Sequence, residues 1–125
     1  MIKSTLARNT ACNAIVRLVD TGSSYSTGQL TVLNSDSTVI TRHTLSNPAF
    51  NDSTDGTAVA NIIYDATAIR DGTAALFSVL NRDSSVIWSG TVTNTHGTGD
   101  LKLNTTIVPV DSTISISSAF FQVPA

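Results

Sequence analysis

Ala74-Ala75-Leu76-Phe77-Ser78-Val79-Leu80 is the stretch of this 125-residue chain that decides its fold. Its apolar side chains fall on both faces of an extended backbone, which is typical of a central strand that is covered on both sides. The two covers would be an opposing sheet and a helix. We therefore predict that residues 74–80 form the centre of the core.

The residues that follow this stretch predict a hairpin. Asn81-Arg82-Asp83-Ser84 is a turn signal, and an alternating segment comes after it. One side of that segment is expected to face the core, namely Val86, Trp88 and Val92. The other side is expected to face outward, namely Ile87, Ser89 and Thr91. Gly90 leaves room for a bulge or a close neighbour.

Before and after this hairpin, apolar and polar residues also alternate along the chain, and turn residues occur about every eight to twelve positions. The alternation predicts further strands around Leu30 and Val32 and near residues 39–45, 58–64 and 114–121. Residues 101–108 are expected to form one strand or a pair of short ones. Residues 47–56 are expected to be a long loop. In the strand near residues 58–64, one face is expected to be shared by Ala58, Ala60, Ile62 and Tyr64.

Before the strands, residues 4–20 have apolar side chains at helical spacing, and Ser4 or Thr5 can cap the start. The predicted inner face consists of Ala7, Ala11, Ala14, Ile15 and Leu18, extended by Cys12, Val16 and Val19. Arg8 falls within this apolar arc, so it has to snorkel or pair. A face this rich in alanine can approach a flat partner closely, and that partner is either the domain's own sheet or a neighbouring chain.

Together these patterns predict one domain over residues 1–125. The fold class is mainly β, a jelly-roll-like antiparallel β-sandwich with one N-terminal amphipathic helix. The helix covers about residues 4–20 and the strands run from about residue 29 to 121. Ser and Thr supply more than a quarter of the residues, and Thr favours pleated surfaces.

The charge content excludes several classes of partner. Charged residues make up 13% of the chain, and the net charge of −2 leaves no basic surface for nucleic acid. No segment has the length of a membrane span or of the apolar core of a signal peptide. We expect neither a nucleic acid nor a membrane as partner.

The residues that carry chemistry do not form a known catalytic or metal-binding pattern. No serine stands in a nucleophile motif, and Cys12 is alone, so it is interpreted as a small buried hydrophobe. His43 lies in a predicted strand and is expected to be a hydrogen-bonded structural residue, whereas His96 lies in a glycine-rich turn. We predict no catalytic residue, no cofactor and no metal, and therefore no enzyme.

Several short motifs resemble those of small bacteriophage virion proteins. They are Ser4-Thr5, Arg8-Asn9, Asn13-Ala14-Ile15, Asp71-Gly72-Thr73-Ala74, Trp88-Ser89-Gly90-Thr91-Val92 and Val123-Pro124-Ala125. Proteins of this kind resemble capsid decoration or cement proteins. The resemblance implies a homo-dimer or homo-trimer that binds the major capsid protein at the virion surface, after assembly in the bacterial host cytoplasm. It implies no active-site residues.

Two segments are the candidate protein contacts. The first is the long loop around Pro48, Phe50 and Asp55, and the second is the tail with Phe120 and Phe121. The two phenylalanines of the tail fit the domain's own core equally well.

Two other functions stay open. One is a tail- or fibre-associated β-module that binds a receptor or glycan, in which Trp88 could stack on a sugar, although its alternation favours the core. The other is a small enzyme with an unfamiliar site, which would need a deep pocket with converging polar groups.

Overall fold

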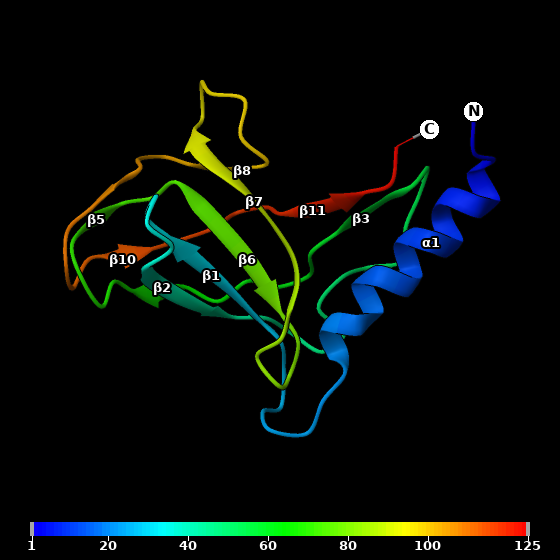
Figure 1. Cartoon of the computed structure of the whole chain (residues 1–125), viewed down its shortest axis with the longest axis horizontal. Coiled ribbons are helices and arrows are strands. Elements are labelled where there is room, and N and C mark those ends of the chain that lie inside the picture. The colour runs from blue at the N-terminus through cyan, green and yellow to red at the C-terminus, as the bar shows by residue number, and fades with distance from the viewer. Residues whose placement is uncertain (1, 125) are drawn as a thin grey trace.

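Strand β6 (Leu76–Leu80) lies in the middle of a five-stranded sheet, as the apolar stretch at residues 74–80 predicts. In this computed structural model, which describes residues 2–124, the strand order is β2-β1-β6-β7-β8 (Figure 1). The other four strands are β1 (Gln29–Leu33), β2 (Val39–Thr44), β7 (Val86–Asn94) and β8 (Leu101–Leu103). All neighbours are antiparallel except β7 and β8, which are parallel.

Three short strand pairs complete the fold. The pairs are β3 (Thr57–Val59) with β11 (Phe120–Gln122), β4 (Ala66–Thr67) with β10 (Thr113–Ile114), and β5 (Gly72–Thr73) with β9 (Ile107–Val108). The pair of β3 and β11 lies beside the helix, and β5 and β10 lie at the opposite end of the molecule (Figure 1). The chain is therefore mainly β, with one N-terminal helix and a curled, antiparallel-rich sheet.

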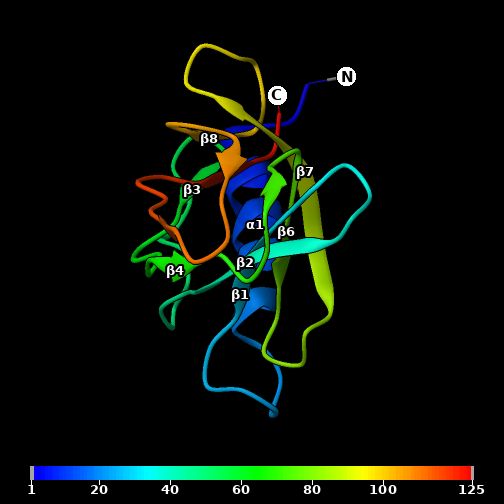
Figure 2. The ribbon, with the colours of Figure 1, turned by 90° about the vertical axis from the view of Figure 1, so that its left-hand side faces the viewer.

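Helix α1 (Thr5–Arg17) begins where the sequence predicts, because the Ser4 hydroxyl accepts a hydrogen bond from the Ala7 amide at 3.1 Å. A short 3₁₀ turn, η1 (Leu18–Asp20), extends it. Figure 2 shows the helix behind the strands of the sheet. Arg8 pairs as expected, since its Nε donates to the Val123 carbonyl at 3.0 Å.

The predicted inner face of the helix is wrong in its main residues. Cys12, Val16 and Val19 are the buried side chains, whereas Ala7 and Ala14 are exposed. The physical reason is the apolar surface area that is removed from water. Because a valine side chain buries more of this area than an alanine side chain, the face with the larger side chains turns inward. Of the predicted alanines, Ala11 does pack against the core, whereas Ala7 and Ala14 lie on the outside of the helix.

The hairpin of β6 and β7 forms as predicted, but a bulge changes the inward and outward positions. Trp88 lies opposite Val79 and Val86 lies opposite Leu80, so Ile87 is an extra residue. Val86 is consequently exposed, while Ile87 packs against the core. Both positions differ from the simple alternation expected from sequence.

Gly90 has the close neighbour that was expected. A Cβ there would lie 2.7 Å from the Phe77 ring. A side chain at this position would therefore collide with the core.

The strand predicted at residues 58–64 also breaks its alternation. β3 ends at Val59, and the chain then leaves β11 to form single bridges from Ala60 to Phe50 and from Ile63 to Leu45. Ala58 and Ala60 are buried as expected, but Ile62 and Tyr64 are exposed. Because the chain changes its pairing partner after Val59, alternate residues of this segment no longer all point toward the core.

Candidate functional site

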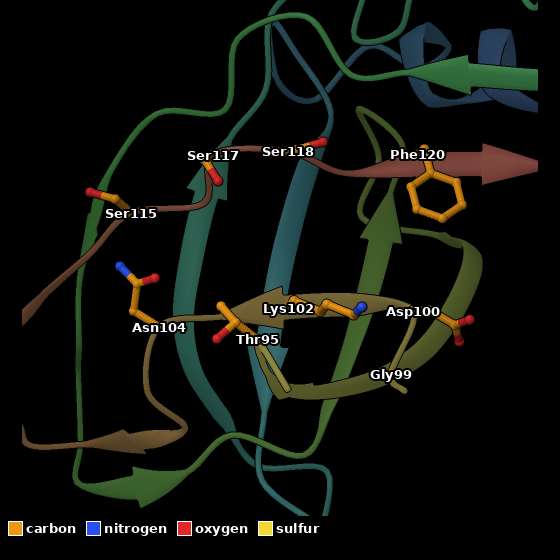
Figure 3. Close-up of a pocket in the computed structure, with 9 residues that line it drawn as sticks. All are labelled: Thr95, Gly99, Asp100, Lys102, Asn104, Ser115, Ser117, Ser118 and Phe120. Carbon is orange, nitrogen blue, oxygen red and sulfur yellow. The ribbon is translucent and has the colours of Figure 1, made fainter. Parts of the chain in front are cut away.

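A groove lies between β8 and residues 115–120. It consists of two adjoining cavities of about 390 and 330 Å³, which share Asp100 and Phe120. The first cavity, drawn in Figure 3, is lined by Thr95, Gly99, Asp100, Lys102, Asn104, Ser115, Ser117, Ser118 and Phe120. The second continues to Phe77, Trp88, Ser89, Phe121, Gln122 and Pro124. We call the two together the β8 groove.

One wall of the β8 groove is built by β8 and the loop before it. Leu101 and Leu103 are buried, so Lys102 and Asn104 alternate onto the groove side. The loop of residues 95–100 returns the chain to run parallel to β7. It is held by a hydrogen bond from the Gly99 amide to the Thr93 hydroxyl at 3.0 Å.

The opposite wall is built by the segment that leads into β11. Ile116 and Ala119 point into the core, which leaves the serines at 115, 117 and 118 on the groove side. Phe120 is 48% exposed and forms the end of this wall. In Figure 3 the serines come from the upper segment, Lys102 comes from the strand below it, and Asn104 comes from the chain directly after that strand.

The polar groups of the groove are of mixed sign and are free to bind. Asp100 Oδ2 accepts one hydrogen bond, from the Thr91 amide at 3.3 Å. Within residues 2–124 the only ion pair joins Arg17 and Asp52, so Lys102 has no carboxylate partner there. In the same part of the chain, the side chains of Ser115, Ser117 and Ser118 make no hydrogen bond.

The predicted contact residues of the long loop separate into exposed and buried ones. Pro48 and Asp55 are exposed, and Asp55 stands at the tip of the turn that precedes β3, with φ of 52°. Phe50 is only 6% exposed and packs edge-on against Trp88, with ring centroids 5.3 Å apart. Phe50 is therefore part of the core in this monomer and offers no surface to a partner.

The two phenylalanines of the tail also have different places. Phe121 packs on Trp88 with ring centroids 4.7 Å apart, so it belongs to the same aromatic cluster as Phe50. Phe120 points away from this cluster into the β8 groove. Trp88 is half-buried: it packs against the core, the side that its alternation indicates, and its ring also borders the second cavity.

Sequence reasoning identified Phe120 but missed the rest of the β8 groove. The signal that was present is the alternation of Ile114 and Ile116 with serines, which places hydroxyls on one side of the segment. Nothing in the sequence shows that β8 lies across from this segment. The groove is a product of the tertiary arrangement.

His43 is the structural histidine that the sequence predicts. It is fully buried, and its Nδ1–H donates to the Tyr64 carbonyl at 2.9 Å, since a carbonyl can only accept. Nε2 is then the acceptor for the Thr41 hydroxyl at 2.8 Å. Both ring nitrogens are used, so His43 has no free nitrogen for acid–base chemistry. Burial lowers the pKa of His43.

We expect this histidine to make stability depend on pH. The pKa of His43 is lower in the folded chain than its usual value of about 6.5. The contribution of His43 to the free energy of unfolding is therefore complete above about pH 6.5, and it is lost as the pH falls through the folded pKa. The melting temperature should therefore drop between about pH 7 and pH 5.

Two variants isolate this effect. His43→Gln should reduce the difference between the two pH values, whereas His96→Gln, at an exposed position, should leave it unchanged. An equal pH dependence in wild type and His43→Gln would contradict the assignment.

Two further observations bear on function. Among residues 2–124, no three His, Cys, Asp or Glu side chains gather in a group that could hold a metal ion. No helix of the same residues is long and apolar enough to cross a membrane.

Comparison with known proteins gives no relative: no family model, no curated protein and no solved structure matches this chain. The function is therefore inferred from the residues and their geometry.

Proposed function

We propose that this chain is a non-enzymatic bacteriophage capsid decoration, or cement, protein. In this proposal it binds the outer surface of the shell formed by the major capsid protein, as a homo-dimer or homo-trimer, and stabilises that shell. It acts at the virion surface after assembly in the bacterial host cytoplasm. The finer description of the fold as a jelly-roll-like sandwich belongs to the same proposal.

The observation that carries the proposal is that large apolar side chains are exposed at several separate places. On the helix they are Leu6 and Leu18, and between β3 and β4 they are Ile62 and Tyr64. At the opposite end of the molecule they are Ile69, Ile107 and Val110. Figure 1 shows the helix and the β5–β10 region at opposite ends. A protein seated at a joint contacts several neighbours at once and needs several such surfaces.

The charge content supports the same view. With 13% charged residues, the chain has few ionic groups that would resist desolvation when several of its sides are covered. Weak contacts at each surface add up when a symmetric oligomer touches several shell subunits, because the later contacts form at high effective concentration.

We assign the contact with the shell to the strip formed by Pro48, Ile62 and Tyr64, which we call the shell-facing strip. Pro48 was a predicted contact residue, and its carbonyl accepts a hydrogen bond from Asn61 Nδ2 at 3.0 Å. This bond holds Pro48 beside the segment that exposes Ile62 and Tyr64. The free side of the helix, with Leu6 and Ala14, is assigned to contacts between copies of the chain.

The alternative function is a tail- or fibre-associated β-module that binds a receptor or glycan. The β8 groove favours it, because a concave site with a few polar groups is typical of small-ligand binding. Cryo-EM of virions with and without this chain separates the two functions. The proposal expects density on the capsid exterior at two-fold or three-fold positions, whereas density only on the tail, or none, would overturn it.

A substitution in the shell-facing strip gives a second test. The double variant Ile62→Ala, Tyr64→Ala should bind capsids that lack the protein about tenfold more weakly or worse, because it removes two large contact side chains. Its folding should be nearly unchanged, since both side chains are exposed and the Tyr64 carbonyl still bonds His43. Cosedimentation with capsids measures binding, and a melting curve measures folding.

Val86→Ala is the matched control, because Val86 is equally exposed but lies on β7, which β1 and β6 separate from β2. We expect this control to cosediment like wild type. Equal cosedimentation by all three proteins, or an equal loss in the control and the double variant, contradicts the assignment of the strip.

A further inference from the structure

We propose that the β8 groove binds a neutral oligosaccharide. This function is additional to attachment to a shell and does not depend on it. The shape of the groove is the first argument. Its two cavities of about 390 and 330 Å³ each lie within the range of small-ligand sites, about 300–1,000 Å³. Because they adjoin at Asp100 and Phe120, they form a trough that suits a chain of ring-sized units.

The second argument is the kind of hydrogen-bonding group that lines the first cavity. Ser115, Ser117 and Ser118 carry hydroxyls, each of which can donate and accept, and Asn104 offers both an amide donor and a carbonyl acceptor. The hydroxyls of a sugar also donate and accept. The serine side chains make no hydrogen bond within residues 2–124, so they are free to pair with such a ligand.

The third argument is the exposed aromatic ring at the junction of the two cavities. Phe120 is 48% exposed, although its neighbour Phe121 packs into the core. A flat ring beside hydroxyl groups offers an apolar surface to the C–H face of a sugar ring, while the polar groups take up its hydroxyls. In Figure 3 the Phe120 ring stands at one end of the serine segment, across from Lys102 and Asp100.

The charges of the lining indicate that the ligand is neutral. Asp100 and Lys102 are the two charged residues of the first cavity, and their charges cancel. An acidic sugar would gain from Lys102 but would be repelled by Asp100. A neutral sugar uses the carboxylate as an acceptor and the ammonium group as a donor.

The groove is held in shape by the core beneath it, so little ordering is needed when a ligand binds. Leu101 and Leu103 anchor β8, and Ile116 and Ala119 anchor the serine segment. Asp100 is held by the Thr91 amide. A site that is already formed loses less entropy on binding, which favours weak but measurable affinity for a short sugar.

The test is an NMR titration of the full chain, labelled with ¹⁵N, against two neutral trisaccharides, maltotriose and tri-N-acetylchitotriose. Trigalacturonate serves as the acidic comparison. We expect saturable shifts of the amides of residues 95–104 and 115–120 with at least one neutral sugar, with a dissociation constant on the order of 1 mM. Trigalacturonate should bind more weakly.

Phe120→Ala should weaken this binding about tenfold or more, because it removes the ring that packs on the sugar. Its folding should survive, since the side chain is exposed and β11 pairs with β3 through the backbone. Phe120→Leu keeps an apolar side chain without a flat ring and should be intermediate. Ile107→Ala, at an exposed position on β9, is the control and should bind like wild type.

Four results of the sugar titrations would overturn the proposal. They are the absence of saturable shifts with both neutral sugars, shifts that map outside the groove, equal weakening by Ile107→Ala, and tighter binding of trigalacturonate. Shifts of the groove residues on raising the protein concentration without sugar would also overturn it, because they would show that a second copy of the chain occupies the groove.

Discussion

Replacing Trp88 by alanine is expected to lower the free energy of unfolding by about 3 kcal/mol, the lower end of the usual cost of removing a large aromatic side chain, because Trp88 is half-buried against the core. Trp88 is packed between Phe50 and Phe121, with ring centroids 5.3 and 4.7 Å away. These three rings join β7, the long loop and the C-terminal strand. Without the indole, both phenylalanines lose their packing partner, and each such pair contributes about 0.5–1.5 kcal/mol beyond its buried area.

The measurement is urea unfolding followed by circular dichroism, since Trp88 is the only tryptophan and its fluorescence is lost in the variant. Trp88→Phe is the control, because it keeps an aromatic ring in the cluster and should lose clearly less stability. A loss below about 1 kcal/mol for Trp88→Ala would contradict the packing of these rings.

The second large effect is expected at Gly28, where Gly28→Ala should cost about 3 kcal/mol, at the upper end of the range for overpacking. Gly28 lies where the end of the helix, the start of β1 and the end of β6 approach one another. A Cβ there would lie 2.6 Å from the Leu80 carbonyl oxygen and 2.8 Å from the Val19 carbonyl oxygen, and it would also collide with Val19 Cγ1. Backbone atoms cannot move aside without shifting the sheet or the helix.

Gly72→Ala is the matched control for this prediction. A Cβ at Gly72 meets only side-chain atoms of Ile40, of which the nearest, Cδ1, would be 2.8 Å away. Because the end of a side chain can rotate, we expect a loss within about 1 kcal/mol. The measurement is the melting temperature of both variants, and that of Gly28→Ala should be clearly lower. Equal melting temperatures would contradict the prediction, because they would show that the backbone around Gly28 moves aside as easily as the Ile40 side chain.

Sequence alone determined the mainly-β class, the helix and the central hairpin of this protein. The apolar stretch at residues 74–80 predicted an inner strand, and β6 indeed lies between β1 and β7. The capping residue Ser4 and the helical spacing after it set the start of α1. The burial of His43 on the same face as Thr41 and Leu45 followed from their alternation, although Ile40 on the other face is buried as well.

Only the tertiary structure decided which faces turn inward where the alternation breaks. The bulge at Ile87 and the change of partner after Val59 depend on distant residues, which a local pattern cannot contain. The same holds for the helix, where the competition between an alanine face and the face of Cys12 and Val16 was settled by the area that the sheet could cover.

The candidate site was determined by the tertiary structure almost entirely. Phe120 could be chosen from the sequence as an aromatic residue in the tail, but its separation from the half-buried Phe121 depends on how β11 pairs with β3. The serines of residues 115–118 face Lys102 and Asn104 because two segments that form no strand pair with each other lie on opposite sides of one groove. Periodicity reports which side of a segment is apolar, and it carries no information about which other segment lies across from it.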